Sequence, residues 1–270
     1  MENITSKSNQ KVKYIKSLNE KKFRQEYNEY YLEGIKVVSE LLDMYKKKAI
    51  DIVSIACSYD ILNKTNGGIE VINKLEKIDD LEILNIESNV FKSLTDTIST
   101  QGILAVLKIP NSNIDSIDKN SNIIILDRLQ DAGNVGTIIR TAISFNVKNI
   151  ICLDGTTDVF SQKVLRSTMA SIFKVNIIYV HDNELNESLN KIKNIGYNII
   201  GTSLQTDNYI SNDLFKGKCA FVVGNEANGI SQKIIEKCDK LVKIPMEENV
   251  ESLNVACAAT ILLYEQFKNK

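Results

Sequence analysis

The sequence predicts a two-domain α/β protein whose second domain contains a parallel β-sheet. Its 270 residues suffice for about two domains at roughly 150 residues each. A polar stretch that starts beside Pro110 has the periodicity of neither a strand nor a helix. Short apolar runs alternate with helical patterns on both sides of it. We therefore expect domains at 1–108 and 122–270, joined by a linker at 109–121.

The first domain is predicted to be a small α/β unit. Extended segments are expected at 30–32, 50–57, 82–86 and 103–107, and helical ones at 10–20, 35–45 and 90–94.

The second domain shows the sharper alternation. Its apolar runs, which we expect to be strands, lie at 123–126, 149–153, 175–180, 197–200, 219–223 and 240–244. They are apolar throughout rather than at every second residue, which is typical of a parallel sheet covered by helices on both faces.

Two amphipathic helices belong to this domain. Apolar residues recur at three- and four-residue steps in two stripes: Val135, Ile138, Ile139, Ala142 and Phe145, then Leu253, Cys257, Ile261, Tyr264 and Phe267. The first stripe predicts a helix packed on the sheet. The second could cover the same sheet or extend to a partner.

Composition excludes several classes of protein. No apolar run approaches the roughly 18 residues of a membrane span, and the first residues contain no apolar signal core, so we expect a cytoplasmic protein. Five scattered cysteines without a C-x-x-C pair indicate reduced, mostly buried side chains. A single histidine, His181, leaves no multi-histidine metal site. We expect no metal and no histidine base.

Basic residues are concentrated near the N-terminus. The net charge is −1, yet the first 25 residues contain seven basic and two acidic side chains. Such a segment is either a solvated helix surface or an arm that faces the phosphates of a nucleic acid. For the second alternative we expect contacts from Lys7, Lys11, Lys13 and Arg24.

Three loops of the second domain follow strands, where ligands bind in open α/β sheets. The first, 127–140, contains Asn134 and Arg140; it could equally be a turn, a helix cap and a surface arginine. The second, 224–231, has P-loop glycine spacing but Ile230 in place of the lysine, which argues against an NTPase. It brackets a carboxylate, Glu226, between Gly224 and Gly229, and the pattern is equally compatible with a tight turn and with a binding site.

The third loop, 244–254, leads into the last helix. Ser252 is placed to cap that helix, whether or not it also has a role in a binding site. Helix-start N–H groups there could bind an anion.

Together, these three blocks resemble the SpoU family of SPOUT-class RNA methyltransferases, across residues 122–267. The family's first motif matches Asn134 and Arg140, the second Gly224 and Glu226, and the third Ile244–Met246 with Ser252–Val255. Ala132 stands where the family often has proline, and Asn225 and Ala227 stand where small residues are common. The segments 6–13, 31–35 and 101–106 are similar to the substrate-binding domain fused to many members, which resembles a ribosomal RNA-binding protein.

The resemblance implies a methyltransferase that transfers a methyl group from S-adenosyl-L-methionine to a ribose 2′-hydroxyl of structured RNA, rRNA in preference to tRNA. It further implies a trefoil knot and a homodimer in which the arginine of one subunit reaches the cofactor pocket of the other. Cofactor contacts would come from Thr202, Gly224, Asn225, Ile244, Met246, Ser252 and Leu253.

By the same resemblance, the catalytic set is Asn134, Arg140, Glu226, Ser252 and Asn254. The family proposal makes the arginine the base, but lowering a guanidinium pKa by about five units costs roughly 7 kcal/mol. We therefore expect Arg140 to clamp phosphate and hydroxyl groups. A catalytically silent RNA-binding module of this fold is the alternative, although all five polar positions are retained. A nucleotide-binding regulator is disfavoured by the missing lysine.

Overall fold

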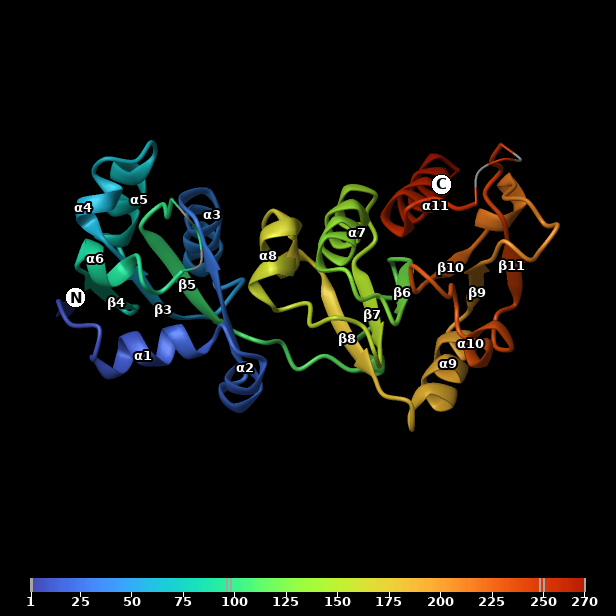
Figure 1. The fold of residues 1–270 in the computed structure, drawn as a ribbon, viewed down its shortest axis with the longest axis horizontal. Helices are drawn as coiled ribbons and strands as arrows, with labels where there is room; N and C mark the ends of the chain where they lie inside the picture. Colours follow the sequence, from blue (N-terminus) through green and yellow to red (C-terminus); the bar gives the residue numbers. More distant parts are fainter. Residues whose placement is uncertain (1, 96, 98, 248, 250, 270) are drawn as a thin grey trace. The chain divides into compact units, whose positions relative to one another are not determined.

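The structure is a computed structural model that describes residues 2–95, 97, 99–247, 249 and 251–269. Its contacts divide the chain into two compact units (Figure 1). Unit 1 comprises Met1–Ile109 and Phe160–Gln162, and unit 2 comprises Pro110–Val159 and Lys163–Lys270. No helix of the described residues is long and apolar enough to cross a membrane.

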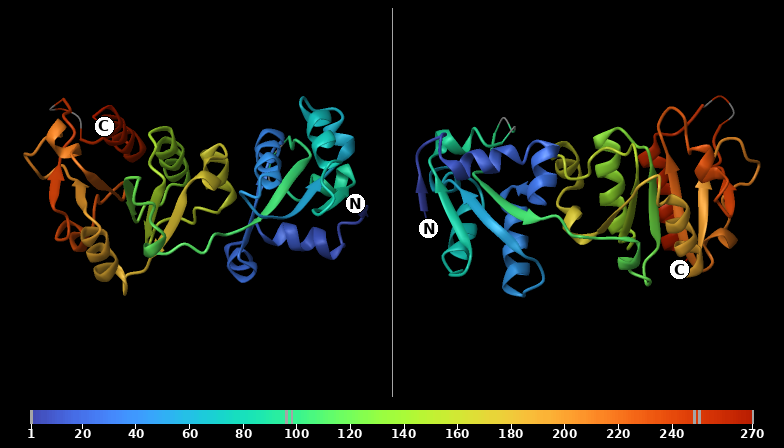
Figure 2. Two further views of the ribbon diagram at one scale, coloured as in Figure 1. Left: turned by 180° about the vertical axis from the view of Figure 1, so that it is seen from behind. Right: turned by 90° about the horizontal axis from the view of Figure 1, so that it is seen from below.

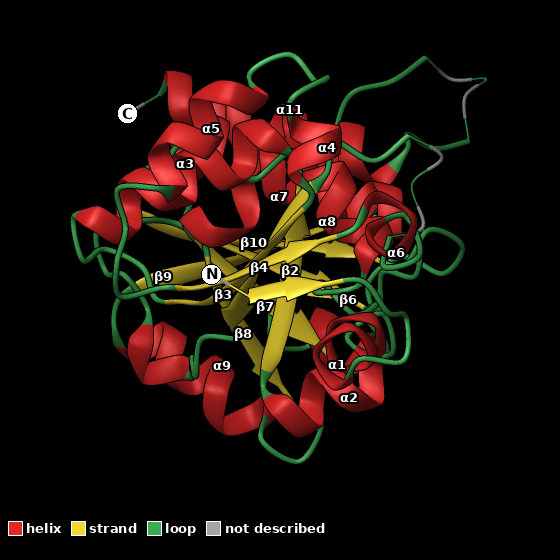
Figure 3. Ribbon diagram, turned by 90° about the vertical axis from the view of Figure 1, so that its left-hand side faces the viewer, coloured by secondary structure: helices red, strands yellow, loops and turns green. Residues whose placement is uncertain are grey.

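Unit 1 is a mixed sheet with helices on both faces (Figure 3). The sheet order is β1-β4-β3-β5-β2, in which β5 runs antiparallel to β2 and β3. The strands are β1 (Glu2–Ile4), β2 (Glu29–Glu33), β3 (Ile52–Cys57), β4 (Glu82–Ile86) and β5 (Ile103–Lys108). The helices are α1 (Gln10–Ser17), α2 (Lys21–Tyr27), α3 (Ile35–Lys46), α4 (Tyr59–Leu62), α5 (Gly68–Leu75) and α6 (Ser88–Phe91).

Unit 2 is an α/β unit on a parallel sheet of order β11-β9-β10-β6-β7-β8, which confirms the predicted fold class. Its strands are β6 (Ile123–Asp127), β7 (Asn149–Leu153), β8 (Asn176–Val180), β9 (Tyr197–Thr202), β10 (Lys218–Gly224) and β11 (Lys240–Val242). Its helices are α7 (Ala132–Ser144), α8 (Gln162–Thr168), α9 (Leu185–Asn194), α10 (Gln232–Ile235) and α11 (Val255–Lys268).

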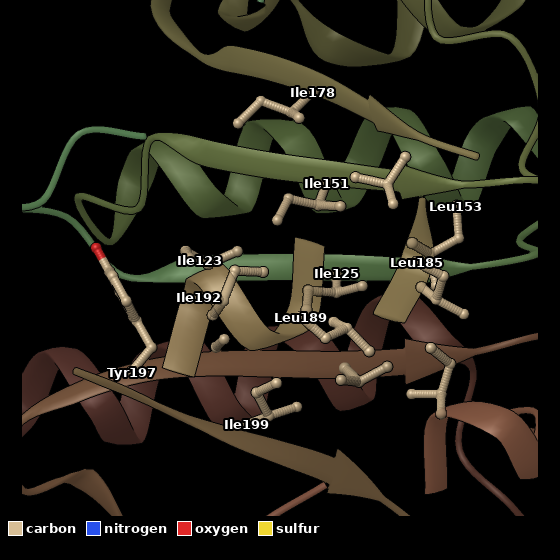
Figure 4. Close-up of a cluster of buried hydrophobic side chains, with 14 of the residues drawn as sticks. Ile123, Ile125, Ile151, Leu153, Ile178, Leu185, Leu189, Ile192, Tyr197 and Ile199 are labelled. Atoms are coloured by element: carbon tan, nitrogen blue, oxygen red, sulfur yellow. The ribbon is translucent and has the colours of Figure 1, made fainter. Parts of the chain in front are cut away.

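Helices cover both faces of this sheet because its strands are apolar on both faces. On one face α7 and α11 lie side by side (Figure 2). On the other, Leu189 and Ile192 of α9 pack against Ile125 and Ile151 of the sheet (Figure 4). Burying each such side chain stabilises the fold by about 1.5–3 kcal/mol.

The stretch expected to be a linker packs as part of unit 2. Ile117 is 6% exposed and belongs to the core beneath α9. The backbone N–H of Asp118 donates to Oδ1 of the buried Asn149 at 2.9 Å. Most of the predicted linker, from Pro110 on, therefore belongs to the second unit.

Candidate active site

The candidate site lies where three loops of unit 2 meet at the carboxyl edge of the sheet. β6 and β10 are neighbouring parallel strands, with Asp127 paired to Gly224 at their ends. The loops that follow them therefore begin side by side and supply Asn134 and Glu226. The third loop, before α11, supplies Asn254 and includes positions 248 and 250, which lie outside the described residues.

A directed chain of hydrogen bonds joins these three side chains. Asn134 donates from Nδ2 to Glu226 Oε1 at 3.1 Å, and Asn254 donates from Nδ2 to Asn134 Oδ1 at 3.0 Å. Asn254 Oδ1 in turn accepts from the backbone N–H groups of Ala256 and Cys257 at 2.9 and 3.3 Å. A carboxylate can only accept and the helix cap must accept, so both amides have one possible orientation.

Glu226 faces the start of α7. Its carboxylate accepts from the backbone N–H groups of Asp131 and Gln130 at 3.3 and 3.4 Å. Partial burial alone would raise the pKa of Glu226, but the hydrogen bonds from Asn134 and these backbone amides outweigh it and lower the pKa below 4.5. The positive end of the α7 dipole adds to this preference for the ionised form. Glu226 is thus a charged anchor at neutral pH.

The predicted cap of the last helix is wrong by two residues. Asn254, rather than Ser252, is the N-cap of α11. Both residue types cap helices well, so the choice depends on where the helix begins. In the structure the Asn254 side chain accepts from the N–H groups of Ala256 and Cys257, and its amide nitrogen also donates to Asn134. Ser252 lies in the preceding loop.

The loop that follows β10, at 224–231, forms a tight turn and also contributes to the candidate site. A Cβ on Gly224 would lie 2.2 Å from the backbone carbon of Gly229, so a side chain has no room there. Asn225 and Gly229 form a bridge through reciprocal backbone hydrogen bonds of 3.0 and 2.8 Å. Gly229 has a φ of +65°, in the left-handed region that favours glycine.

Asp127 and Arg128 hold the two loops together, a pair that the sequence reasoning missed. The fully buried carboxylate of Asp127 accepts from Ser231 N and from Arg128 Nε at 2.5 and 3.0 Å. Arg128 also donates from Nη2 to the Gly229 carbonyl at 3.3 Å, while its own carbonyl accepts from Asn225 Nδ2 at 3.0 Å. Its φ of +59° is unusual for a residue with a side chain. The sequence signal that could have identified this pair is an aspartate at the end of a strand followed directly by an arginine.

A cavity of about 690 Å³ opens beside the cluster. Every residue predicted to contact the cofactor lines it: Thr202, Gly224, Asn225, Ile244, Met246, Ser252 and Leu253. Glu226 and Asn254 line it too.

The cavity's chemistry fits S-adenosyl-L-methionine. Leu204, Ile235 and Val242 supply apolar wall, while Glu226 and Glu251 supply negative charge that suits a sulfonium. Lys243 is the one cation among the described lining residues, so a polyphosphate would be poorly neutralised. The volume is also within the range of small-molecule sites, about 300–1,000 Å³.

Arg140 does not join the cluster of its own chain. It lies on α7 about 9 Å along the helix axis from Asn134. Its side chain is exposed and makes no hydrogen bond or ion pair with the described residues. The chain therefore brings four of the five predicted catalytic residues together: Glu226, Ser252 and Asn254 line the cavity, and Asn134 is bonded to Glu226 and Asn254.

The four basic residues predicted to contact RNA differ in their exposure and in the partners they already have. Lys7 and Lys13 are exposed. Lys11 pairs with Glu2 and Glu82 at 2.6 and 2.7 Å, and hydrogen bonds to those carboxylates raise its pKa to about 12.

Arg24 was wrongly assigned to an RNA-facing surface. It is 3% exposed, and its Nη1 donates to the carbonyls of Leu18 and Asn19 at 2.7 and 2.8 Å. Its guanidinium satisfies carbonyls that follow α1, which is a structural role.

The sequence predicted neither a histidine base nor a metal site. His181 is exposed and its Nδ1 lies 2.9 Å from Asp154 Oδ1, outside the cavity lining. Within the described ranges, no group of three or more His, Cys, Asp or Glu side chains is arranged to hold a metal ion.

Two sequence families match this chain. Residues 121–264 match the SpoU rRNA Methylase family, and residues 9–105 match the MRM3-like substrate binding domain. Among curated proteins, the 23S rRNA (guanosine(2553)-2′-O)-methyltransferase RlmP of Bacillus subtilis is 33% identical over 264 residues, covering 98% of each chain. A putative TrmH family tRNA/rRNA methyltransferase of Staphylococcus aureus is 32% identical over 150 residues, which is 56% of this chain and 60% of that protein.

Solved structures share the whole fold. The AdoMet-bound rRNA methyltransferase of Sinorhizobium meliloti superposes with a TM-score of 0.83 at 26% identity, covering 99% of this chain and 97% of that one. The SpoU methyltransferase AviRb of Streptomyces viridochromogenes, in complex with AdoMet, has the same fold at 22% identity, with a TM-score of 0.81 and coverages of 96% and 97%.

Proposed function

This chain belongs to the SpoU rRNA methylase family, and we propose that it methylates a ribose 2′-hydroxyl of 23S rRNA at the cavity beside Asn134, Glu226 and Asn254. It is an S-adenosyl-L-methionine-dependent RNA 2′-O-ribose methyltransferase. The choice of 23S rRNA rests on the full-length relative from Bacillus subtilis. The observation that carries the proposed site is the bonded series Glu226–Asn134–Asn254 beside a cavity lined by all seven predicted cofactor residues.

We propose that Asn134 and Asn254 position the ribose. Each amide nitrogen uses one N–H within the cluster, which leaves a second N–H for a substrate oxygen. When bound, S-adenosyl-L-methionine would supply an electrophilic methyl group: the 2′-oxygen forms the new O–C bond as the S–C bond breaks, the bonding pair stays on sulfur, and the hydroxyl proton leaves to water. Holding that oxygen in line is the main task of the protein groups.

Glu226 is a positioning residue in this scheme. A carboxylate with a lowered pKa that already accepts three hydrogen bonds is a weak base. Its charge orients the Asn134 amide, and through it the Asn254 amide. Ser252 and Leu253, in the loop that leads to Asn254 and α11, would contact the cofactor.

We further propose a homodimer in which Arg140 of the partner subunit completes each site as a clamp for phosphate and the 2′-hydroxyl. Its exposure on α7 and its lack of a partner among the described residues support this arrangement. The neighbouring α11 exposes Tyr264 and Phe267 at 49% and 47%, which supplies apolar area for a subunit interface.

Residues 1–108 are proposed to bind the RNA substrate, as the match to a substrate binding domain suggests. Lys7 and Lys13 are the basic side chains we assign to phosphate contacts. We also propose that the enzyme acts in the cytoplasm, where it would meet a ribosomal RNA substrate.

The test combines cofactor binding with mapping of the product. Calorimetry should detect binding of S-adenosyl-L-methionine and of its demethylated product, with no binding of ATP. Purified enzyme should then transfer a labelled methyl group to 23S rRNA from a deletion strain, and mass spectrometry of nuclease fragments should locate it on a ribose. ATP binding without S-adenosyl-L-methionine binding, or a methyl group on a base, would contradict the proposal.

A further inference from the structure

The segment that follows β9 exposes an aromatic side chain near the cavity. Tyr209 is 56% exposed, and Leu204 of the same segment is 51% exposed and lines the cavity. The ring and hydroxyl of Tyr209 make no hydrogen bond, ion pair or ring contact with another described residue. Apolar area is thus presented to solvent beside the site of methyl transfer.

The backbone of Tyr209 is nevertheless held in place. Tyr209 forms a parallel bridge with Lys243, just beyond the end of β11. Lys243 N donates to the Asn208 carbonyl at 2.7 Å, and Ile210 N donates to the Lys243 carbonyl at 3.2 Å. Hydrogen bonds on both sides fix this backbone, so ordering the ring against a ligand costs only the freedom of two side-chain torsions.

Tyr209 lies next to the cavity lining but is not part of it. Its bridge partner Lys243 lines the cavity, as do Ile244 and Met246 after it, whereas Tyr209 does not. A ligand enclosed in the cavity would not cover the tyrosine. A larger ligand that extends past the lining on the side of Lys243 would reach it.

We propose that Tyr209 stacks on a nucleobase of the RNA substrate at or next to the methylated nucleotide, with Lys243 beside it facing the phosphate. The proposal rests on the RNA methyltransferase function. A ribose hydroxyl can reach an enclosed site when its nucleotide is splayed out of regular stacking, and an aromatic side chain then replaces the lost base contact. A lysine next to the ring suits the backbone of a nucleic acid.

The experiment uses the full-length protein with Tyr209→Leu, which removes the π face but keeps apolar volume, and Tyr209→Phe, which keeps the ring. Tyr179→Leu is the matched control, because Tyr179 is a 41% exposed tyrosine on β8, at the opposite edge of the same sheet. For each variant we would measure the KM for unmethylated 23S rRNA, kcat, the Kd for S-adenosyl-L-methionine and the molar mass in solution.

Tyr209→Leu should raise the KM for RNA by about 5- to 100-fold, the range expected for loss of one stacked base. Its Kd for the cofactor should stay within about twofold of wild type, and Tyr209→Phe and Tyr179→Leu should resemble wild type. An unchanged KM would overturn the proposal. So would an equal loss of cofactor affinity, which would put Tyr209 in the cofactor site, or a changed molar mass, which would put it in a subunit interface.

RNA affinity measured by filter binding separates this proposal from the function on which it rests. If wild type transferred no methyl group, the proposed function would fail, yet Tyr209→Leu would still have to weaken RNA binding. Equal binding by wild type and Tyr209→Leu would then refute the stacking role on its own.

Discussion

Asn254 and Asn134 are 120 residues apart in the chain, and their side-chain amides are joined by a 3.0 Å hydrogen bond. Each residue belongs to the start of a helix: Asn254 caps α11, and Asn134 lies in the first turn of α7. The two helix starts and the carboxylate of Glu226 therefore form one unit, in which moving any member changes the orientation of the other two.

The first prediction concerns the charge of Glu226. Glu226→Gln replaces one accepting oxygen with an amide that cannot accept from the backbone N–H of Gln130 or Asp131. Hydrogen bonds to charged groups are worth about 1.5–3 kcal/mol, so kcat should fall by roughly 10- to 100-fold. Steady-state methyl transfer measures this. Glu236→Gln is the control, because Glu236 is an exposed glutamate directly after α10. Comparable losses of kcat in both variants would count against a specific role for Glu226.

The same carboxylate predicts a pH dependence of stability. The folded-state pKa of Glu226 is lowered, so its stabilising contribution is present above the unfolded value near 4.5 and is lost as pH falls through the folded pKa. The difference in unfolding free energy between wild type and Glu226→Gln should be constant from about pH 6 to 8 and shrink below about pH 4.5. Urea titrations at several pH values measure it. A difference that grew on acidification would reverse the assigned sign.

A mixing experiment tests the proposed dimer. If Arg140 acts on the partner's site, Arg140→Ala mixed with Asn254→Ala gives heterodimers in which one site carries both defects and the other none. Activity should return to about half per heterodimer, by two-fold symmetry. Asn134→Ala mixed with Asn254→Ala is the control, because these side chains bond within one chain and each heterodimer site keeps one defect. Heterodimers confirmed by mass spectrometry but inactive in the first mixture would place Arg140 in its own subunit's site.

Substitutions of the basic residues of unit 1 should have unequal effects on RNA binding and on stability. Lys7→Gln and Lys13→Gln should each flatten the log-log salt dependence of RNA binding by about 0.7–0.9. Lys11→Gln should change it less, because Lys11 is already paired with Glu2 and Glu82. Arg24→Gln should lower the melting temperature instead, since it leaves buried carbonyls of Leu18 and Asn19 without donors. Equal slopes for Lys7→Gln and Lys11→Gln would contradict this ranking.

The sequence by itself determined the strands and the edge of the sheet that carries the site. Strand runs at 82–86 and 149–153 match β4 and β7 to the residue, because each contains apolar side chains that are buried in its sheet. The missed strand β1 has three residues, too few for any periodicity. Since parallel strands end at one edge, their following loops could be named as site-forming, and residues of the second and third loops line one cavity.

Tertiary structure alone decided how individual polar side chains are used. Arg24 stands among lysines in the sequence, yet it is buried because carbonyls after α1 need donors. Ser252 and Asn254 are both good caps, and the folded chain uses the second, whose side chain also bonds to Asn134. Arg128 is a surface-type residue whose conformation is set by a buried carboxylate and a carbonyl of another loop. Apolar burial is encoded locally by pattern, whereas a hydrogen bond depends on a partner's position to within a fraction of an ångström, which only the folded chain supplies.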